Sequence, residues 1–188
     1  STLMATSNLD NLIGFLKVFP EQHPLYYFLI KFVSLNDSLF EIRLFSLLCG
    51  AMAVTPLYWI GKKLYSPGTA VAACILFAFS PFMVYYNQEG RMYTLLVLLA
   101  LIQVAFLIQW CNGGSRSAKI GFVIFSILAL YTHFFTLFLL VSELCWILVW
   151  QKKNPMAKIR FGELIGVMAV VGLVYSPWMI RIVGGMGG

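Results

Sequence analysis

The sequence predicts an all-α fold: a polytopic bundle of transmembrane helices with a helical juxtamembrane loop on the extracytoplasmic side. Of its 188 residues, 61% are hydrophobic and only 11% are charged, whereas soluble domains carry about 25% charged residues. The apolar residues also form runs that approach the roughly 20 residues needed to cross a bilayer. Such a chain has more apolar surface than one water-soluble core can bury, and lipid is therefore its expected solvent.

Six membrane spans are expected after residue 43. They cover residues 44–60, 69–86, 92–110, 119–132, 134–150 and 164–183. The fourth and fifth spans come from one apolar run that would be about 46 Å long as a single helix, against a hydrocarbon core of about 30 Å. A hairpin turn near His133 divides this run and brings Lys119 and Lys152 to the same side, as the positive-inside rule requires.

The basic residues set the expected orientation. Lysine and arginine gather in the loops on one side of the predicted bundle, with Glu163 as the one acid among them: Lys62, Lys63, Arg116, Lys119, Lys152, Lys153, Lys158 and Arg160. That side is predicted to be cytoplasmic. Because these residues lie in short runs between apolar stretches, the net charge of +6 indicates membrane loops, and no nucleic-acid partner is expected.

Residues 1–43 are expected to form the extracytoplasmic juxtamembrane loop. Ser7 and Asp10 have the spacing of a capping box before a short amphipathic helix. Residues 25–33 are apolar but too short to span, so they are expected to lie in the membrane interface. A chain that begins outside the membrane requires an earlier span, and the sequence is therefore expected to be a fragment of a longer protein.

Glu21 and His23 form the first candidate site. A carboxylate and an imidazole stand two residues apart, and Pro24 stiffens the chain after them. Such a pair can hold a divalent metal ion, or act as acid and base, so both residues are candidate catalytic and metal-binding groups. The alternative is an interfacial loop with ordinary solvated polar groups, and the spacing leaves both interpretations open.

A second polar cluster follows the second predicted span. It contains Gln88, Glu89, Arg91 and Tyr93 at the outward turn. The guanidinium of Arg91 offers a fork of donors that suits a phosphate group. In the alternative interpretation Arg91 pairs with Glu89 and caps the turn, while the tyrosines form an aromatic belt at the membrane surface.

Two further polar residues lie in the predicted hairpin. His133 stands at its outward tip, where it either caps the turn or contacts a ligand. Glu143 lies ten residues further along, roughly 15 Å deeper at helical rise. A carboxylate at membrane depth is a functional candidate, but a hydrogen-bonded structural glutamate is the preferred interpretation.

The ordered set of motifs resembles the C-type polytopic glycosyltransferases, in the branch of the protein O-mannosyltransferases and lipid A aminoarabinose transferases. The matching segments are His23-Pro24-Leu25-Tyr26-Tyr27, Arg43-Leu44-Phe45-Ser46, Ser80-Pro81, Tyr86 to Tyr93, Tyr131-Thr132-His133 and Tyr175-Ser176-Pro177-Trp178. The chain departs from the family pattern where one proline after His23 is missing, where Phe45 replaces proline and where Gly90 replaces alanine. The resemblance covers nearly the whole chain.

The resemblance implies an inverting transfer of a sugar from a polyprenyl-phosphate carrier to a lipid or protein acceptor. It implies a multi-pass protein of a bacterial plasma membrane, with the site on the extracytoplasmic face and membrane lipid around it. It adds Arg43 to the substrate-binding candidates, which are then Arg43, Gln88, Glu89, Arg91, Tyr93 and His133. The family's catalytic aspartate is expected before Ser1, and a divalent metal ion at Glu21 and His23 is the one cofactor considered.

Two other functions remain open at the level of sequence. A transporter or channel module would use Glu143, Arg91 and His133 along a polar path through the bilayer. A structural subunit would tolerate the loss of Arg91 and His23. The position of the polar residues separates the first of these from a glycosyltransferase, which should gather them at one membrane face above apolar spans.

Overall fold

The computed structural model describes residues 9–19, 23–33, 38–113, 115–153 and 161–185, and all regular structure within these ranges is helical. The helices are α2 (Leu9–Val18), α3 (Pro24–Val33), α4 (Leu39–Leu64), α5 (Pro67–Ala78), α6 (Pro81–Glu89), α7 (Tyr93–Gly113), α8 (Arg116–Leu130), α9 (Thr136–Lys153) and α10 (Phe161–Gly185). The prediction of an all-α bundle is confirmed. The N-terminal half of the expected capping box, Ser7, lies outside the described residues.

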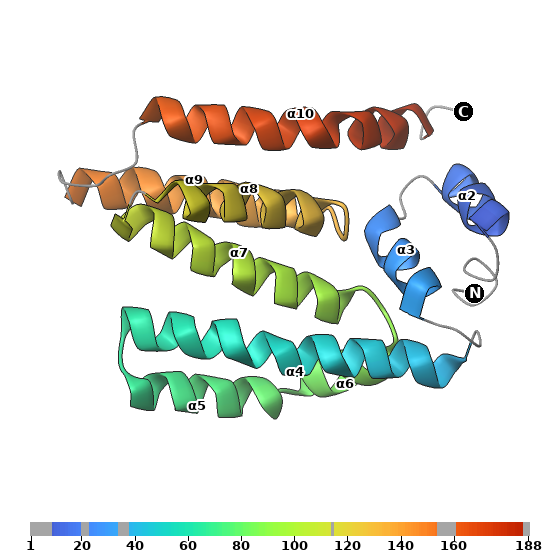
Figure 1. Cartoon of the computed structure of the whole chain (residues 1–188), viewed down its shortest axis with the longest axis horizontal. Helices are drawn as coiled ribbons and strands as arrows, with labels where there is room; N and C mark the ends of the chain where they lie inside the picture. Colours follow the sequence, from blue (N-terminus) through green and yellow to red (C-terminus); the bar gives the residue numbers. More distant parts are fainter. Residues whose placement is uncertain (1–8, 20–22, 34–37, 114, 154–160, 186–188) are drawn as a thin grey trace.

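The long helices lie side by side in layers (Figure 1). The central helix α7 packs against α4 on one side and α8 on the other, α5 and α6 lie beyond α4, and α10 lies against α8. One buried apolar cluster joins α7, α8, α9 and α10, and includes Trp110, Phe122 and Ile147. A second cluster joins α7 and α4 to the short helices α2 and α3.

Three of the described helices are long and apolar enough to cross a membrane, namely α4, α7 and residues Gly162–Gly184 of α10. The pair α5 and α6 passes the same test as one unit but is bent by 52° at its break. By their length and composition, these helices are those of an integral multi-pass membrane protein. The assignment of six spans with their boundaries stays a prediction.

The break between α5 and α6 occurs at Ser80 and Pro81. Ser80 has an extended backbone and its Oγ accepts a hydrogen bond from the Met83 N–H at 3.1 Å, so it caps the new helix. Pro81 is in the first turn, where its missing N–H costs nothing. The Ser-Pro pair therefore begins a new helix at this position and bends the chain.

The second Ser-Pro pair behaves differently, since Pro177 lies inside the continuous helix α10. A proline at this position removes the N–H that would bond the carbonyl of Leu173. The hydroxyl of Ser176 donates to that carbonyl oxygen instead, at 2.8 Å. The helix continues because the serine side chain supplies the donor that the proline lacks.

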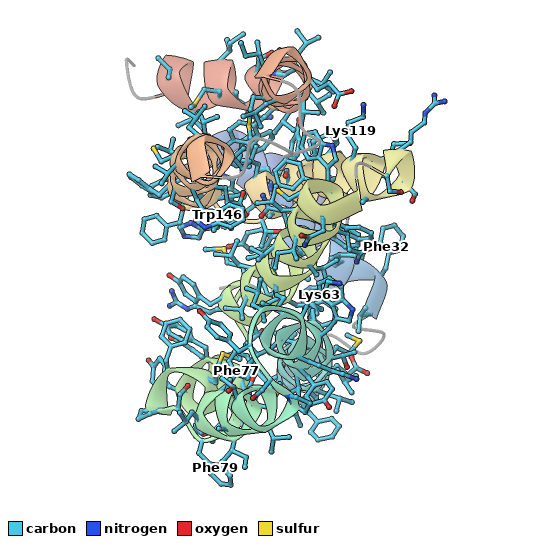
Figure 2. All side chains as sticks on the ribbon, turned by 90° about the vertical axis from the view of Figure 1, so that its left-hand side faces the viewer. Phe32, Lys63, Phe77, Phe79, Lys119 and Trp146 are labelled. Carbon is cyan, nitrogen blue, oxygen red and sulfur yellow. The ribbon has the colours of Figure 1, made fainter. Side chains whose placement is uncertain are left out.

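The two ends of the bundle differ in chemistry. Lys62 and Lys63 lie in the last turn of α4, and Lys119 Nζ is 3.6 Å from Glu163 Oε1 near the starts of α8 and α10. Figure 2 views the molecule from this end and labels Lys63 and Lys119. The connection between α8 and α9 lies at the opposite end, next to α3 (Figure 1), and Leu25 at the start of α3 bonds Tyr131 in it. This separation is what the sequence-based orientation requires.

Three helices share a polar network in the middle of the bundle. Gln103 of α7 is fully buried, and its Nε2 donates to Ser126 Oγ of α8 and to Glu143 Oε2 of α9, each at 3.0 Å. Glu143 itself is only 6% exposed. The contacts support the interpretation of Glu143 as a hydrogen-bonded structural residue.

Replacing Gln103 with leucine is expected to lower the free energy of unfolding by about 1–2 kcal/mol, because Ser126 and Glu143 lose their shared donor. Glu143→Gln keeps an oxygen that can accept from Gln103 and is expected to retain most stability and activity. Gln109→Leu, at an exposed position of the same helix, is the matched control. Denaturant unfolding of the full-length protein in micelles measures the effect, and equal losses in Gln103→Leu and Gln109→Leu would contradict it.

Candidate functional site

Residues far apart in sequence meet at the end of the bundle where α3 lies. His23 precedes α3 and is 2% exposed, and its Nε2 lies 2.9 Å from the Tyr175 hydroxyl of α10. The Leu25 N–H donates to the Tyr131 carbonyl at 3.1 Å. These two contacts fasten the first turn of α3 to α10 and to the turn between α8 and α9.

The ring of His133 lies parallel to the ring of His23, with centroids 5.9 Å apart and planes inclined by 3°. Its Nδ1 accepts a hydrogen bond from the Phe135 N–H at 3.2 Å, so the neutral ring carries its proton on Nε2. Burial lowers the pKa of His133 from its ordinary value, because desolvation disfavours the charged imidazolium. The lowered pKa favours the neutral form of His133, in which Nε2 can donate a hydrogen bond.

Tyr93 connects this histidine pair to a cavity. Its ring centroid lies 5.7 Å from that of His133 and 4.4 Å from that of Tyr86. Tyr93 also lines a cavity of about 370 Å³ together with Arg91 and the rings of Tyr26 and Tyr27. A cavity of this size and aromatic character falls in the range of small-ligand sites.

The guanidinium of Arg91 forms an ion pair and also borders this cavity. Its Nε lies 3.3 Å from Glu89 Oε1, and the Arg91 side chain is 59% exposed. The Tyr85 hydroxyl donates to the same oxygen at 3.3 Å. The two sequence interpretations of Arg91, a turn-capping ion pair and a phosphate ligand, are thus compatible, since the Nε edge bonds Glu89 while the side chain lines the cavity.

Gly90 permits the tight turn between Glu89 and Arg91. It caps α6 in the left-handed conformation, with φ of 66°, which glycine adopts without steric cost. Its carbonyl accepts a hydrogen bond from the Tyr26 hydroxyl. Burial raises the pKa of Tyr26, so this phenol stays protonated and continues to act as the donor.

Arg43 and Gln88 lie in a different place from Arg91. Both line a second cavity of about 630 Å³, with Asn87 beside them and apolar side chains of α4, α5 and α6 around them. The Oδ1 atom of Asn87 is buried and finds no hydrogen-bond partner among the described residues. It packs against Gly50, where an added Cβ would approach Asn87 Oδ1 to 2.2 Å.

The sequence-predicted site residues therefore fall into three neighbouring groups. Arg91 and Tyr93 line the first cavity, with Glu89 paired to Arg91, while Arg43 and Gln88 line the second. His23 and His133 stack beside Tyr93. His23 does not line the Arg91 cavity, because its ring is buried against Tyr175.

The metal assignment concerns Glu21 and His23, and Glu21 lies outside the described residues. Among the residues that the structure describes, no three His, Cys, Asp or Glu side chains gather closely enough to hold a metal ion. The proposed roles of Glu21 and His23 in catalysis and metal binding stay predictions.

Sequence reasoning did not single out Tyr175, Tyr26 or Tyr27 as site residues. All three belong to the motifs that carry the family resemblance, at positions 26–27 and 175–178. Their membership of these motifs could therefore have identified the three tyrosines as candidate site residues. The pairing of Tyr175 with His23 had no local signal, because the two residues are 152 positions apart.

A protein-family model described as dolichyl-phosphate-mannose-protein mannosyltransferase matches residues 21–180 of the chain. This range includes the Arg43 cavity, every lining residue of the Arg91 cavity except Phe15, the stacked histidines and all helices from α3 to α9. No curated protein and no solved structure matches the chain.

Proposed function

Since the chain belongs to the dolichyl-phosphate-mannose-protein mannosyltransferase family, and is therefore a membrane glycosyltransferase, we propose that it transfers a sugar from a polyprenyl-phosphate carrier with inversion. The acceptor is a hydroxyl of a lipid or protein on the extracytoplasmic side, in a bacterial plasma membrane. The observation that best supports this is the gathering of Arg91, Tyr93 and His133 at one end of an apolar bundle.

In the proposed reaction the acceptor hydroxyl attacks the anomeric carbon from the face opposite the phosphate. The new carbon–oxygen bond forms as the bond between the anomeric carbon and the phosphate oxygen breaks, which inverts the anomeric configuration. The carrier phosphate leaves with the bonding electron pair. The acceptor proton passes to a carboxylate acting as general base, and Glu21 is the candidate carboxylate within this chain, with His23 beside it in sequence.

Cationic and neutral donors of the site would stabilise the departing phosphate. Arg91 supplies charge and a forked donor geometry, and the neutral His133 supplies the N–H on Nε2. If a divalent metal ion binds at Glu21 and His23, it would add Lewis-acid stabilisation of the same phosphate oxygens. The aromatic rings around Arg91 would face the sugar and keep water from the reacting carbon.

The transporter alternative requires a polar path through the bilayer. Gln103, Ser126 and Glu143 are the buried polar side chains at membrane depth that bond to one another, and the two hydrogen bonds join three helices. This arrangement favours a packing role, and it supports the transferase over a transport path.

The test is a transfer assay with the full-length protein in lipid vesicles. The donors are polyprenyl-phosphate sugars presented one at a time, with the corresponding nucleotide sugars as the matched control, and the anomeric configuration of the product is read by NMR. We expect transfer only from a lipid-linked donor, with the opposite anomeric configuration. Transfer from the nucleotide sugar in carrier-free vesicles, or retention of configuration, would contradict the proposal.

A further inference from the structure

We propose that the groove between α8 and α10 binds a phospholipid with a zwitterionic, hydrogen-bond-donating headgroup, of the phosphatidylethanolamine class. The headgroup phosphate meets Lys119, the headgroup ammonium meets Glu163, and one acyl chain lies in the groove. The site is at the end of the bundle that also carries Lys63 (Figure 2). It lies away from the candidate functional site, and the inference does not depend on the proposed transfer reaction.

The groove has a volume of about 440 Å³, and its two walls each begin with a charged residue. Both helices start at this end of the bundle, so the residues that follow the charged ones lie deeper in it. Along α10 the apolar wall extends about 10 Å beyond the charged residue at helical rise. The lining residues are Lys119, Ile120, Val123 and Ile124 of α8 and Glu163, Gly166, Val167 and Val170 of α10.

Gly166 gives the groove its depth. A Cβ added at Gly166 would meet no atom within 4 Å, while the neighbouring Val167 is only 7% exposed and forms part of the floor. The rims are Ile120, Ile124 and Val170, each 48% exposed. The groove is therefore an open apolar channel of a volume found in small-ligand sites, and its width suits an extended hydrocarbon chain.

The apolar part of the groove cannot by itself select one lipid. All lipid tails are as apolar as its valine and isoleucine side chains, so an acyl chain gains only packing contacts there. Selection has to come from the charged groups at the end of the groove. A specific lipid is therefore expected only if its headgroup complements Lys119 and Glu163.

The two charged side chains remain able to bond a headgroup. Lys119 Nζ lies 3.6 Å from Glu163 Oε1, and the side chains are 32% and 40% exposed. This distance exceeds the roughly 3 Å of an N–H···O hydrogen bond, and neither side chain forms a hydrogen bond within the described part of the chain. Lys119 thus keeps its three donors, and Glu163 keeps its acceptor sites.

Adjacent opposite charges match a headgroup that itself carries opposite charges. In phosphatidylethanolamine the phosphate can accept from Lys119 while the primary ammonium donates to Glu163, which gives two charge-assisted hydrogen bonds. Phosphatidylglycerol would bring a net negative charge beside the Glu163 carboxylate. Phosphatidylcholine has both charges, but its quaternary ammonium has no N–H to donate. The charged pair therefore favours phosphatidylethanolamine over both.

The test is photo-cross-linking of the full-length protein in nanodiscs of phosphatidylcholine. Trace lipids with a diazirine on one acyl chain carry an ethanolamine, glycerol or choline headgroup, and the labelled residues are located by mass spectrometry. Gly166→Phe fills the groove, and Gly172→Phe is its matched control. Both glycines are exposed on α10 with no atom within 4 Å of an added Cβ, but only Gly166 lines the groove. Glu163→Gln removes the negative charge at equal length.

We expect the ethanolamine probe to label residues 119–124 and 163–170 about fivefold more than either other probe, since half-exposed charge pairs contribute modestly. Gly166→Phe should remove this labelling, and Gly172→Phe should leave it unchanged. Glu163→Gln should shift the preference to phosphatidylglycerol, because the cations Lys119 and Arg116 remain.

Three results would overturn the assignment: equal labelling by the three probes, a preference for ethanolamine that persists in Glu163→Gln, or equal loss of labelling in the two phenylalanine variants. A groove that no probe labels in the full-length protein would be covered by protein rather than lipid, and would overturn it as well. Loss of sugar transfer without loss of this labelling would concern the proposed function alone.

Discussion

Arg91→Lys is expected to lower the rate of sugar transfer by at least about tenfold, which corresponds to about 1.4 kcal/mol of lost transition-state stabilisation. Arg91 Nε bonds Glu89 while the remaining nitrogens of the fork stay available at the cavity. A lysine has a single charged nitrogen, which cannot serve Glu89 and a phosphate with the same geometry. The positive charge of the lysine alone is therefore not expected to restore the rate of sugar transfer.

The measurement is transfer by the full-length enzyme at saturating donor, together with its unfolding midpoint. Arg116→Lys is the matched control, because Arg116 is exposed at the start of α8, at the opposite end of the bundle. A wild-type rate in Arg91→Lys would remove Arg91 from the site. An unchanged unfolding midpoint in both variants is expected, since exposed ion pairs contribute little to stability.

A substitution of His23 is expected to lower both the stability of the protein and its rate of sugar transfer. His23→Phe keeps an aromatic ring that can stack on His133 but removes the nitrogen that meets the Tyr175 hydroxyl. Tyr175 is 3% exposed, so its hydroxyl is left buried without this partner, at an expected cost of about 1–3 kcal/mol. Transfer should fall as well, because α3 carries Tyr26 and Tyr27 of the Arg91 cavity.

A double-mutant cycle checks this assignment. Tyr175→Phe removes the hydroxyl, and the combination of Tyr175→Phe with His23→Phe should be less destabilised than the sum of the two single variants. Unfolding by denaturant in micelles supplies the free energies. Strict additivity of the two changes would show that the His23–Tyr175 contact does not couple α3 to α10.

The fold class and the family were predictable from the sequence because both depend on signals carried within short segments. The apolar runs around α4, α7 and α10 exceed what a soluble core needs, and the motifs at positions 23–27, 80–93 and 131–133 occur in family order. An apolar run and a short motif can each be recognised within one segment of the sequence. A contact between two residues far apart in the chain has no such local pattern.

The two Ser-Pro pairs show a feature of secondary structure that could not be predicted from the local sequence. Identical dipeptides begin a helix at Ser80 and continue one at Ser176. The outcome depends on whether the serine hydroxyl accepts from a following N–H, as in Ser80, or donates to a preceding carbonyl, as in Ser176. The dipeptide permits both, and the surrounding packing selects one.

The arrangement of the candidate site could not be predicted from the sequence either. The sequence groups Arg43, Arg91 and His23 as polar residues of one face, but it does not determine which of them share a cavity. Arg43 and Arg91 border different cavities because Gly90 stands between them, and His23 turns into the bundle because Tyr175 offers a partner. Each of these outcomes depends on contacts between helices that are distant in the chain.

The contacts of α2 and α3 with α10 also fix the order in which a newly made chain can be completed. His23 can contact the Tyr175 hydroxyl only after Tyr175, 152 positions later, has been synthesised. The Leu16 carbonyl can likewise accept its hydrogen bond only after Arg181, 165 positions later, has been synthesised. At about 5–20 residues per second, the ribosome needs roughly 8–30 s to supply Tyr175 after His23. During biosynthesis α2 and α3 can pack against α4 and α7 before α10 is made, because these helices share one buried apolar cluster, and the two hydrogen bonds to α10 are the last of their contacts to form.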